Sequence, residues 1–379
     1  MYEMGSNDRA FLRTARQVSG RRTSVRIVDL FSGCGGMTLG VEEAARRIGR
    51  TLDVRLAVEQ DHDIASTYAK NFSPAQGEGR QLAESWFGKL PARPLSFAER
   101  RTRKLVGDVD VLVGGPPCQG HSTLNNYTRG DDPKNTLYSL MARATQVLEP
   151  ECVIIENVPA VERDSRGTVD RTVEHLLRSG YLVDVGIVCV SEIGVPQMRR
   201  RHVVIAHRES QPSIETALDF ARVSRPRNLR WAIRDLLSKE GCSPFDMPSL
   251  MSPENIRRAN FLLKKKIFDL PNAMRPPCQQ TAHKYKSMYG RLSWDAPAQT
   301  ITTGFGSPGQ GRYIHPERPR TLTPHEAARI QFFPDWFDFS PLKGRKAVAE
   351  AIGNAVPSKL SFVLSSHLIG LKAHRASAL

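Results

Sequence analysis

Long apolar runs and closely spaced cysteines are both missing from this 379-residue sequence. No stretch of about eighteen apolar residues occurs, and the N-terminus lacks the apolar core of a signal peptide. The sequence therefore predicts a cytoplasmic protein. Without a C-x-x-C pair or a His-rich partner segment, neither a disulfide framework nor a structural zinc site is expected. The six cysteines are Cys34, Cys118, Cys152, Cys189, Cys242 and Cys278.

Acidic residues are scarce relative to basic ones. The chain has 54 Lys and Arg against 39 Asp and Glu, a formal net charge of +15 at pH 7. Residues 221–290 hold fourteen Lys and Arg against five Asp and Glu, so this stretch alone contributes +9. Such a concentration favours a nucleic-acid partner, although a solvated basic surface would have the same composition. Lys264, Lys265 and Lys266 form a basic run there and are candidate nucleic-acid contacts.

Short apolar runs alternate with segments of helical character in the first half of the chain. The expected strands are 25–30, 56–58, 109–113, 152–155, 182–190 and 202–206. This alternation predicts an α/β fold with a doubly wound parallel sheet, whose ligands gather beyond the carboxyl ends of the strands.

The alternation stops near residue 222, which predicts a change of domain. We expect a basic N-terminal arm or short helix over 1–23, with Arg9, Arg13 and Arg16 at helical spacing. A catalytic domain over 24–222 is completed by 345–379, which includes a helical segment that packs back on it. Residues 223–344, rich in Pro, Ser, Arg and Lys through residue 287, form a smaller inserted domain and hinge.

A glycine-rich turn follows the first expected strand. Gly33, Gly35 and Gly36 would let the backbone approach a nucleotide-like ligand closely. A dinucleotide fingerprint would need a third glycine where Thr38 stands, which weakens an NAD interpretation. Glu59 ends the next strand, where its carboxylate could accept hydrogen bonds from ribose hydroxyls, and Gln60 follows it. The alternative for Glu59 is a surface acid at a strand end.

A candidate nucleophile follows the third expected strand. In Gly114-Gly115-Pro116-Pro117-Cys118-Gln119, two prolines would hold the Cys118 thiol rigidly at the edge of the ligand crevice. A free cysteine is more often an inert core residue. Pro-Pro-Cys-Gln recurs at 276–279 without a preceding strand, so Cys278 is interpreted as incidental.

Charged residues flank the next two strands. Glu156 ends the strand at 152–155 and would emerge beside Cys118 at the same sheet edge. Gln197-x-Arg199-x-Arg201 opens the strand at 202–206 and is expected to present Arg199 and Arg201 on one face. Each charge alone could be an ordinary salt bridge, but a thiol, an acid and a guanidinium at strand ends together predict a catalytic site.

In order along the chain, these motifs resemble the signature set of DNA cytosine-5 methyltransferases. The matching segments are Asp29-Leu30-Phe31-Ser32-Gly33-Cys34-Gly35-Gly36, Pro116-Pro117-Cys118-Gln119, Glu156-Asn157-Val158, Gln197-x-Arg199-x-Arg201 and Gly353-Asn354-x-Val356. The resemblance spans almost the whole chain and implies a class I S-adenosylmethionine-dependent fold, a bacterial enzyme of restriction-modification or defence type, and duplex DNA as substrate.

The resemblance also implies roles for individual residues. Cys118 is the nucleophile, Glu156 holds the N3 and amino edge of cytosine, and Arg199 and Arg201 orient base and phosphate. From their place in the sequence, Gln119, His121, Ser122 and the loop to Asp132 are expected to close over the base. The implied target-recognition region coincides with the basic stretch. The implied lining of the S-adenosylmethionine site is Phe31, Gly33, Gly35, Glu59, Gln60, Pro117, Leu137 and Asn354.

Several positions depart from the family pattern. The usual Gly-Asp pair, whose acid contacts the cofactor adenine, has no clear counterpart, since Asp108 and Asp110 lie too close to Cys118. Lys134 replaces a common arginine, Ala355 a common serine, and Phe332 a common glycine. The adenine contact is therefore left open, while the catalytic trio is complete.

The chemistry explains why these groups belong together. Cytosine C5 is too weak a nucleophile to take a methyl group directly, so a thiolate must first add at C6. This addition builds negative charge at N3 and O2, which a protonated Glu156 and a cationic Arg201 would stabilise. The base must leave the duplex for Cys118 to reach C6. No metal is required, and a monomer would suffice.

A tRNA cytosine-5 methyltransferase and a silent DNA-binding module remain alternatives, whereas a zinc deaminase is disfavoured. A tRNA cytosine-5 methyltransferase would use the same trio. A zinc deaminase needs H-x-E and P-C-x-x-C, but His121 stands where the second cysteine should be. A catalytically silent DNA-binding module would need only the basic stretch.

Overall fold

The computed structural model describes residues 4–17, 23–77, 80–88, 94–117, 137–164, 166–280 and 287–376. The chain divides into two compact units. The sheet unit comprises Arg16–Cys189, Arg200–Arg222 and Val356–Leu379, and the loop-rich unit comprises Met1–Ala15, Val190–Arg199 and Val223–Ala355. In the part of the chain that is described, no helix is long and apolar enough to cross a membrane.

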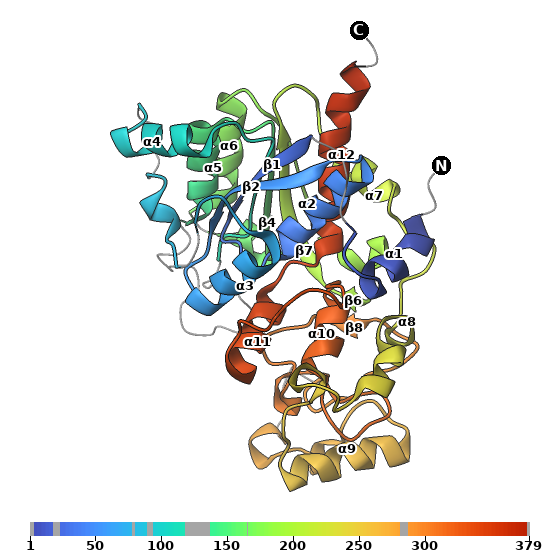
Figure 1. Cartoon of the computed structure of the whole chain (residues 1–379). Coiled ribbons are helices and arrows are strands. Elements are labelled where there is room, and N and C mark those ends of the chain that lie inside the picture. Colours follow the sequence, from blue (N-terminus) through green and yellow to red (C-terminus); the bar gives the residue numbers. More distant parts are fainter. Residues whose placement is uncertain are drawn as a thin grey trace. The chain divides into compact units, whose positions relative to one another are not determined.

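A six-stranded sheet in the order β2-β1-β3-β4-β7-β5 forms the centre of the sheet unit (Figure 1). Its strands are β1 (Ser24–Leu30), β2 (Thr51–Val58), β3 (Val111–Gly114), β4 (Cys152–Asn157), β5 (Leu182–Cys189) and β7 (Arg200–His207). Neighbours from β2 to β4 are parallel, whereas β7 is antiparallel to both β4 and β5. The expected α/β class and all six expected strands are confirmed.

The expectation of a wholly parallel sheet is wrong at β7. A parallel neighbour needs a crossover connection, usually a helix. Here the segment between β5 and β7 closes on itself, because the Val190 amide donates to the Arg199 carbonyl at 2.9 Å. The chain therefore re-enters the sheet beside the strand that it has just left, and runs in the opposite direction.

Helices cover both faces of the sheet (Figure 1). Tyr138, Met141 and Leu176 from the α5 and α6 side pack with Val28, Leu112 and other sheet residues in one buried core. The opposite face is covered mainly by α2 and α12, and the Ser361 hydroxyl of α12 donates to the Met37 carbonyl at 2.8 Å. The helices of this unit are α2 (Gly36–Arg47), α3 (His62–Phe72), α4 (Phe97–Val106), α5 (Leu137–Leu148), α6 (Thr168–Arg178), α7 (Ile214–Asp219) and α12 (Ser358–Ala376).

The loop-rich unit gathers segments that are distant in sequence. Short strands β6 (Gln197–Met198) and β8 (Ala298–Gln299) pair in parallel, and Ala259, Leu262, Leu270 and Ile314 form a small core. Its helices are α1 (Met4–Arg13), α8 (Leu229–Ile233), α9 (Pro253–Lys265), α10 (Pro324–Ile330) and α11 (Gly344–Asn354). Helix α1 and residues 190–199 thus belong to this unit, although they precede residue 223 in sequence.

Candidate active site

The glycine turn at the end of β1 is built from backbone conformations that most side chains disfavour. Phe31, Gly33 and Gly35 have φ values of 59°, 54° and 97°. A Cβ on Gly35 would lie 2.3 Å from the ring of Phe72, so this position has no room for a side chain. A Cβ on Gly33 would meet nothing within 4 Å among the described residues. The turn is therefore packed tightly on one side and open on the other.

Glu59, at the end of β2, is tied to this turn. Its Oε2 accepts a hydrogen bond from the Gly33 amide and its Oε1 accepts one from the Asp61 amide, both at 2.9 Å. Burial raises the pKa of this carboxyl above its ordinary value. Gln60, the next residue, is exposed. The carboxylate is thus fixed beside the open side of the glycine turn.

Three buried side chains near the glycine turn, Asp29, Thr38 and Tyr68, are linked by hydrogen bonds. Thr38 donates from its hydroxyl to Asp29 Oδ2 at 2.6 Å, and the Thr38 and Tyr68 hydroxyls lie 2.8 Å apart. Burial raises the pKa of the Asp29 carboxyl to about 7. Thr38 therefore has a positive role where a dinucleotide fold would have glycine. Sequence reasoning missed Tyr68, because nothing near it in sequence marks it as a partner of Asp29.

These groups fit a nucleoside-containing cofactor. The open face at Gly33 allows close approach of a ligand, and Glu59 offers the acceptor that ribose hydroxyls require. The Ser32 hydroxyl is buried and has no hydrogen-bond partner among the described residues. Phe31 and Leu137, two other predicted lining residues, pack against the same core as β1.

The turn before the predicted nucleophile is fixed by the neighbouring strand. Asn157, the last residue of β4, donates from Nδ2 to the Pro116 carbonyl at 3.1 Å, and its Oδ1 accepts the Val158 amide at 2.8 Å. Pro117 is half-buried. Cys118, Gln119 and Ser122 lie outside the described residues, which stop at Pro117 and resume at Leu137.

Glu156 lies at this turn and is paired with a guanidinium. Arg201 Nε approaches Glu156 Oε1 to 2.5 Å, and both side chains are largely buried. A Cβ on Gly115 would lie 3.3 Å from Glu156 Oε2, so the carboxylate rests against the backbone three residues before Cys118. An acid, a guanidinium and the turn that leads to the thiol are thus brought together, as the sequence predicts.

The expectation that Arg199 and Arg201 project from one face of one strand is wrong. Strand β7 begins at Arg200, so Arg201 lies in the sheet and Arg199 precedes it, within the loop-rich unit. The Arg199 guanidinium donates to the carbonyls of Ile301, Gly353 and Ala355 at 2.9, 3.4 and 3.1 Å. The structure therefore gives the two arginines different partners.

Gln197 continues the anchoring around Arg199. Its Nε2 donates to Gln331 Oε1 at 2.7 Å, and its Oε1 accepts the Ile301 amide at 3.2 Å. Gly353 allows this packing, since a Cβ there would lie 2.3 Å from the Thr303 nitrogen. Asn354, a predicted cofactor contact, is exposed at the end of α11.

The remaining candidates fall on the surface or away from the site. Lys264, Lys265 and Lys266 are exposed at the C-terminal end of α9. Asp108 and Asp110 pair with Arg26 before β3 begins. They therefore lie at the amino ends of the strands, whereas Glu59 follows the carboxyl end of β2. The turn Pro277–Gln279 that contains Cys278 follows another short turn, Asn272–Met274, rather than a strand. Among the described residues, no three His, Cys, Asp or Glu side chains gather as metal ligands.

Comparison with known proteins bears on this arrangement. The profile of the C-5 cytosine-specific DNA methylase family matches residues 25–369. The type II methyltransferase M1.BsuMI of Bacillus subtilis is 44% identical over 346 residues, which are 91% of this chain and 80% of that protein. The type II methylase M.HgiDII of Herpetosiphon aurantiacus is 29% identical over 359 residues, 90% of this chain and 94% of that protein.

Two solved structures share the fold at low sequence identity. A DNA modification methyltransferase encoded within an E. coli prophage superimposes with a TM-score of 0.63 at 23% identity, covering 92% of this chain and 99% of that one. The S. pombe Dnmt2 methyltransferase superimposes with a TM-score of 0.62 at 18% identity, covering 92% and 99%.

Proposed function

This chain belongs to the C-5 cytosine-specific DNA methylase family, and we propose that it methylates a cytosine flipped out of a specific duplex DNA sequence through a covalent adduct of Cys118. It is a DNA cytosine-5 methyltransferase with an α/β fold. The single observation that carries the finer proposal is the Arg201–Glu156 pair against the turn that leads to Cys118.

Cys118 begins the reaction in this mechanism. Its thiolate adds to C6 of the cytosine, and the π electrons of the C5–C6 double bond shift to C5 and toward N3, which makes C5 nucleophilic. Positive charge nearby favours the thiolate. Asn157 holds the Pro116 carbonyl, so the turn delivers the sulfur from a fixed backbone.

Glu156 and Arg201 act on the opposite edge of the ring. Glu156 Oε1 faces Arg201, which leaves Oε2 to carry the proton that Glu156 donates to N3 of the base. Arg201 offsets the negative charge that develops as the thiolate adds. A base such as water then removes the C5 proton of the methylated adduct, and the C6–S bond breaks to release Cys118.

S-adenosylmethionine, when bound, supplies the methyl group. The glycine turn and Glu59 fit this role by their shape and hydrogen-bond acceptors. Phe31, Gly33, Gly35, Glu59, Gln60, Pro117 and Leu137 are the proposed contacts of the sheet unit, and Asn354 is proposed from the family motif alone. Release of the product, S-adenosylhomocysteine, completes the cycle, and no metal enters this scheme.

The sheet unit is proposed to be catalytic and the loop-rich unit to read the target. The exposed Lys264, Lys265 and Lys266 support the second assignment, as do the thirteen basic residues of 223–290. Gln119 and Ser122 are proposed to face the DNA from the loop after Cys118. A bacterial cytoplasmic setting, a monomeric enzyme and a cognate type II restriction partner belong to the same proposal. The similarity to type II methyltransferases supports the restriction partner.

A methyl-transfer assay tests this function. The protein is incubated with radiolabelled S-adenosylmethionine and either mixed-sequence duplex DNA or tRNA, beside Cys118→Ala and Cys278→Ala. Label in DNA that is lost only with Cys118→Ala is the expected result, and bisulfite sequencing then reveals the target. Label in tRNA alone would correct the substrate. DNA binding without any label would favour a silent DNA-binding module.

A further inference from the structure

Helix α1 is built into the loop-rich unit by buried contacts. Asp8 pairs with Arg227 at 2.8 Å, and both side chains are at least nine-tenths buried. The Arg227 guanidinium lies over the ring of Trp231, 4.0 Å from its centroid. Leu12 is also buried. These contacts show that α1 is an integral part of this unit.

One partner of α1, Phe332, has an unusual backbone conformation. Phe332 is buried and has a φ of 68°, a region that favours glycine. Its ring stacks on Phe11 of α1, with centroids 6.0 Å apart and planes at 19°, and on Trp231, at 6.4 Å and 17°. A bulky side chain persists in such a conformation only when its surroundings hold it there. Phe11 and Trp231 supply that support.

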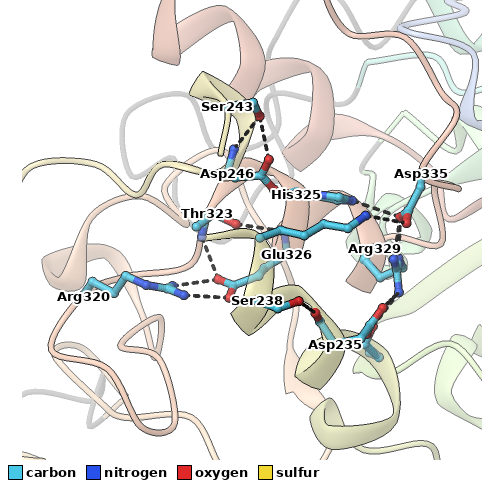
Figure 2. A network of polar contacts seen from close by, with 12 residues as sticks. Asp235, Ser238, Ser243, Asp246, Arg320, Thr323, His325, Glu326, Arg329 and Asp335 are labelled. Carbon is cyan, nitrogen blue, oxygen red and sulfur yellow. Dashed lines mark hydrogen bonds and ion pairs between the residues drawn. The ribbon is translucent and has the colours of Figure 1, made fainter. Parts of the chain in front are cut away.

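Polar contacts tie α1 to the segments on either side of this stack. The Asp335 amide donates to the Leu12 carbonyl at 2.9 Å, and Arg13 donates to Asp235 at 2.9 Å. Figure 2 shows that Asp235 and Asp335 are themselves joined through Arg329. The segment around Phe332 is therefore contacted by α1 directly, through the Phe11 ring and the Leu12 carbonyl, and indirectly through Asp235 and Arg329.

Gln331, the residue before Phe332, binds a backbone carbonyl that Arg199 also binds. Gln331 is buried, accepts from Gln197, and donates from Nε2 to the carbonyls of Ile352 and Ala355 at 2.6 and 3.2 Å. Arg199 binds the Ala355 carbonyl and that of Gly353 as well. Two buried side chains therefore fix the turn on both sides of Asn354.

We propose that Phe11 is a positioning residue for methyl transfer, which acts through Phe332 and Gln331 on the Gly353-Asn354 turn and on Arg199. The inference rests on the proposed function insofar as Asn354 contacts the cofactor. Loss of the Phe11 ring lets residue 332 relax, which moves the Gln331 amide away from the carbonyls that it binds. The expected result is a displaced Asn354 rather than an unfolded protein.

The test compares Phe11→Ala with Phe11→Leu, which keeps most of the apolar volume, and with Phe220→Ala, which removes an exposed phenylalanine of the sheet unit. Hydrogen exchange is measured over residues 350–357 and over β1 in the full chain. Binding of S-adenosylhomocysteine is titrated calorimetrically below the unfolding temperature. Phe332→Gly is a second variant, because it removes the ring while relieving the unfavourable φ.

Phe11→Ala should speed exchange over residues 350–357 by about tenfold without changing β1. It should weaken S-adenosylhomocysteine binding about fivefold or more at full stoichiometry. Phe11→Leu should restore most of both. Phe332→Gly should show little of the Phe11→Ala effect, because glycine adopts this φ without strain, and Phe220→Ala should change neither.

Two results would overturn the positioning role. One is exchange over 350–357 that is unchanged in Phe11→Ala, or that rises as much in Phe332→Gly as in Phe11→Ala. The other is unchanged affinity with a reduced stoichiometry, which means that Phe11 only stabilises the fold. Absence of S-adenosylhomocysteine binding by the wild-type protein would instead contradict the cofactor assignment, and the exchange measurement would still test the path from Phe11 to the turn.

Discussion

Among single side chains, Arg201 and Glu156 form a largely buried ion pair. Removing Arg201 would leave a largely buried carboxylate without its guanidinium and would remove positive charge from the edge of the base. We expect Arg201→Ala to lower the single-turnover methylation rate on the order of 10²-fold to 10³-fold. The rate is measured with labelled S-adenosylmethionine at saturating DNA.

Arg200→Ala is the matched control for this prediction, since Arg200 is the exposed neighbour of Arg201 in β7. Both variants lose one positive charge at adjacent positions. Equal rate losses would show that general charge, rather than the pair with Glu156, governs the reaction.

Asp29 gives a prediction on stability and pH. Because burial raises its pKa from 3.8 to about 7, the folded state binds this proton more tightly than the unfolded state. The group therefore costs stability increasingly as pH rises from about 4 to 7, and the cost is constant above pH 7. Asp29→Asn removes this cost but weakens the bond from Thr38.

Urea unfolding at several pH values tests the sign of this effect. The free energy of unfolding of Asp29→Asn, relative to wild type, should rise between pH 4 and 7 by a few kcal/mol, at about 1.4 kcal/mol per pKa unit. Asp170→Asn, at an exposed position of α6, is the control for the substitution itself. A flat difference for Asp29→Asn would contradict the raised pKa.

The role of a residue could be predicted where the neighbouring sequence determines it, and not where tertiary packing does. Glu59 and Glu156 could be identified because strand ends and motif order place them. Tyr68 could not, since only packing of α3 against the glycine turn brings its hydroxyl to Thr38. The position of Arg199 was predicted wrongly, because the prediction assumed that Arg199 and Arg201 lie in one strand. Strand β7 begins only at Arg200.

Among elements, α4 and α5 are joined by one buried ion pair. Arg143 donates to both carboxylate oxygens of Glu99 at 2.7 and 2.6 Å, and Glu99 also accepts from the Ser96 and Gly88 amides. The Arg143 guanidinium, aided by these amides, lowers the pKa of Glu99 to about 2. This stabilisation is fully present above the ordinary pKa of about 4.3 and is lost as pH falls toward 2.

Arg143→Met should therefore destabilise the protein at neutral pH by about 3–5 kcal/mol, because Glu99 is left charged and buried. Differential scanning calorimetry measures the loss. The double variant Glu99→Gln with Arg143→Met should recover part of it, since no charge is then buried. A double variant no better than Arg143→Met would indicate that lost packing, not the unpaired charge, causes the effect.

Elements were predictable from sequence to different degrees. The buried strands were found because apolar runs such as 25–30 and 152–155 signal burial directly. The direction of β7 was not predicted, since a run of apolar residues does not show whether a strand is parallel or antiparallel to its neighbours. Helix α1 was foreseen only as an arm or short helix, and its stacking on Phe332 depends on residues more than three hundred positions away.

At the scale of the whole molecule, the division of the chain was harder to predict than the fold class. Residue 222 was predicted as a boundary because the strand pattern stops there. The chain passes from the sheet unit to the loop-rich unit between Arg222 and Val223. The assignment of residues 1–15 and 190–199 to the loop-rich unit rests on tertiary contacts such as Asp8 with Arg227. Composition carries no information about them.

The charge distribution gives the last prediction. If the basic run at the end of α9 neutralises DNA phosphates, replacing Lys264, Lys265 and Lys266 by alanine should weaken DNA binding and flatten its salt dependence. The slope of log K against log salt should become shallower by up to about 2.7, since each phosphate contact contributes about 0.9.

A matched variant that replaces Arg100, Arg101 and Lys104 of α4 by alanine removes the same charge from the sheet unit. Binding to labelled duplex DNA is measured between low and physiological salt for both variants. Equal slopes for the two variants would mean that overall charge, rather than contacts from α9, drives DNA binding, whereas a shallower slope for the α9 variant alone would place phosphates along that helix end.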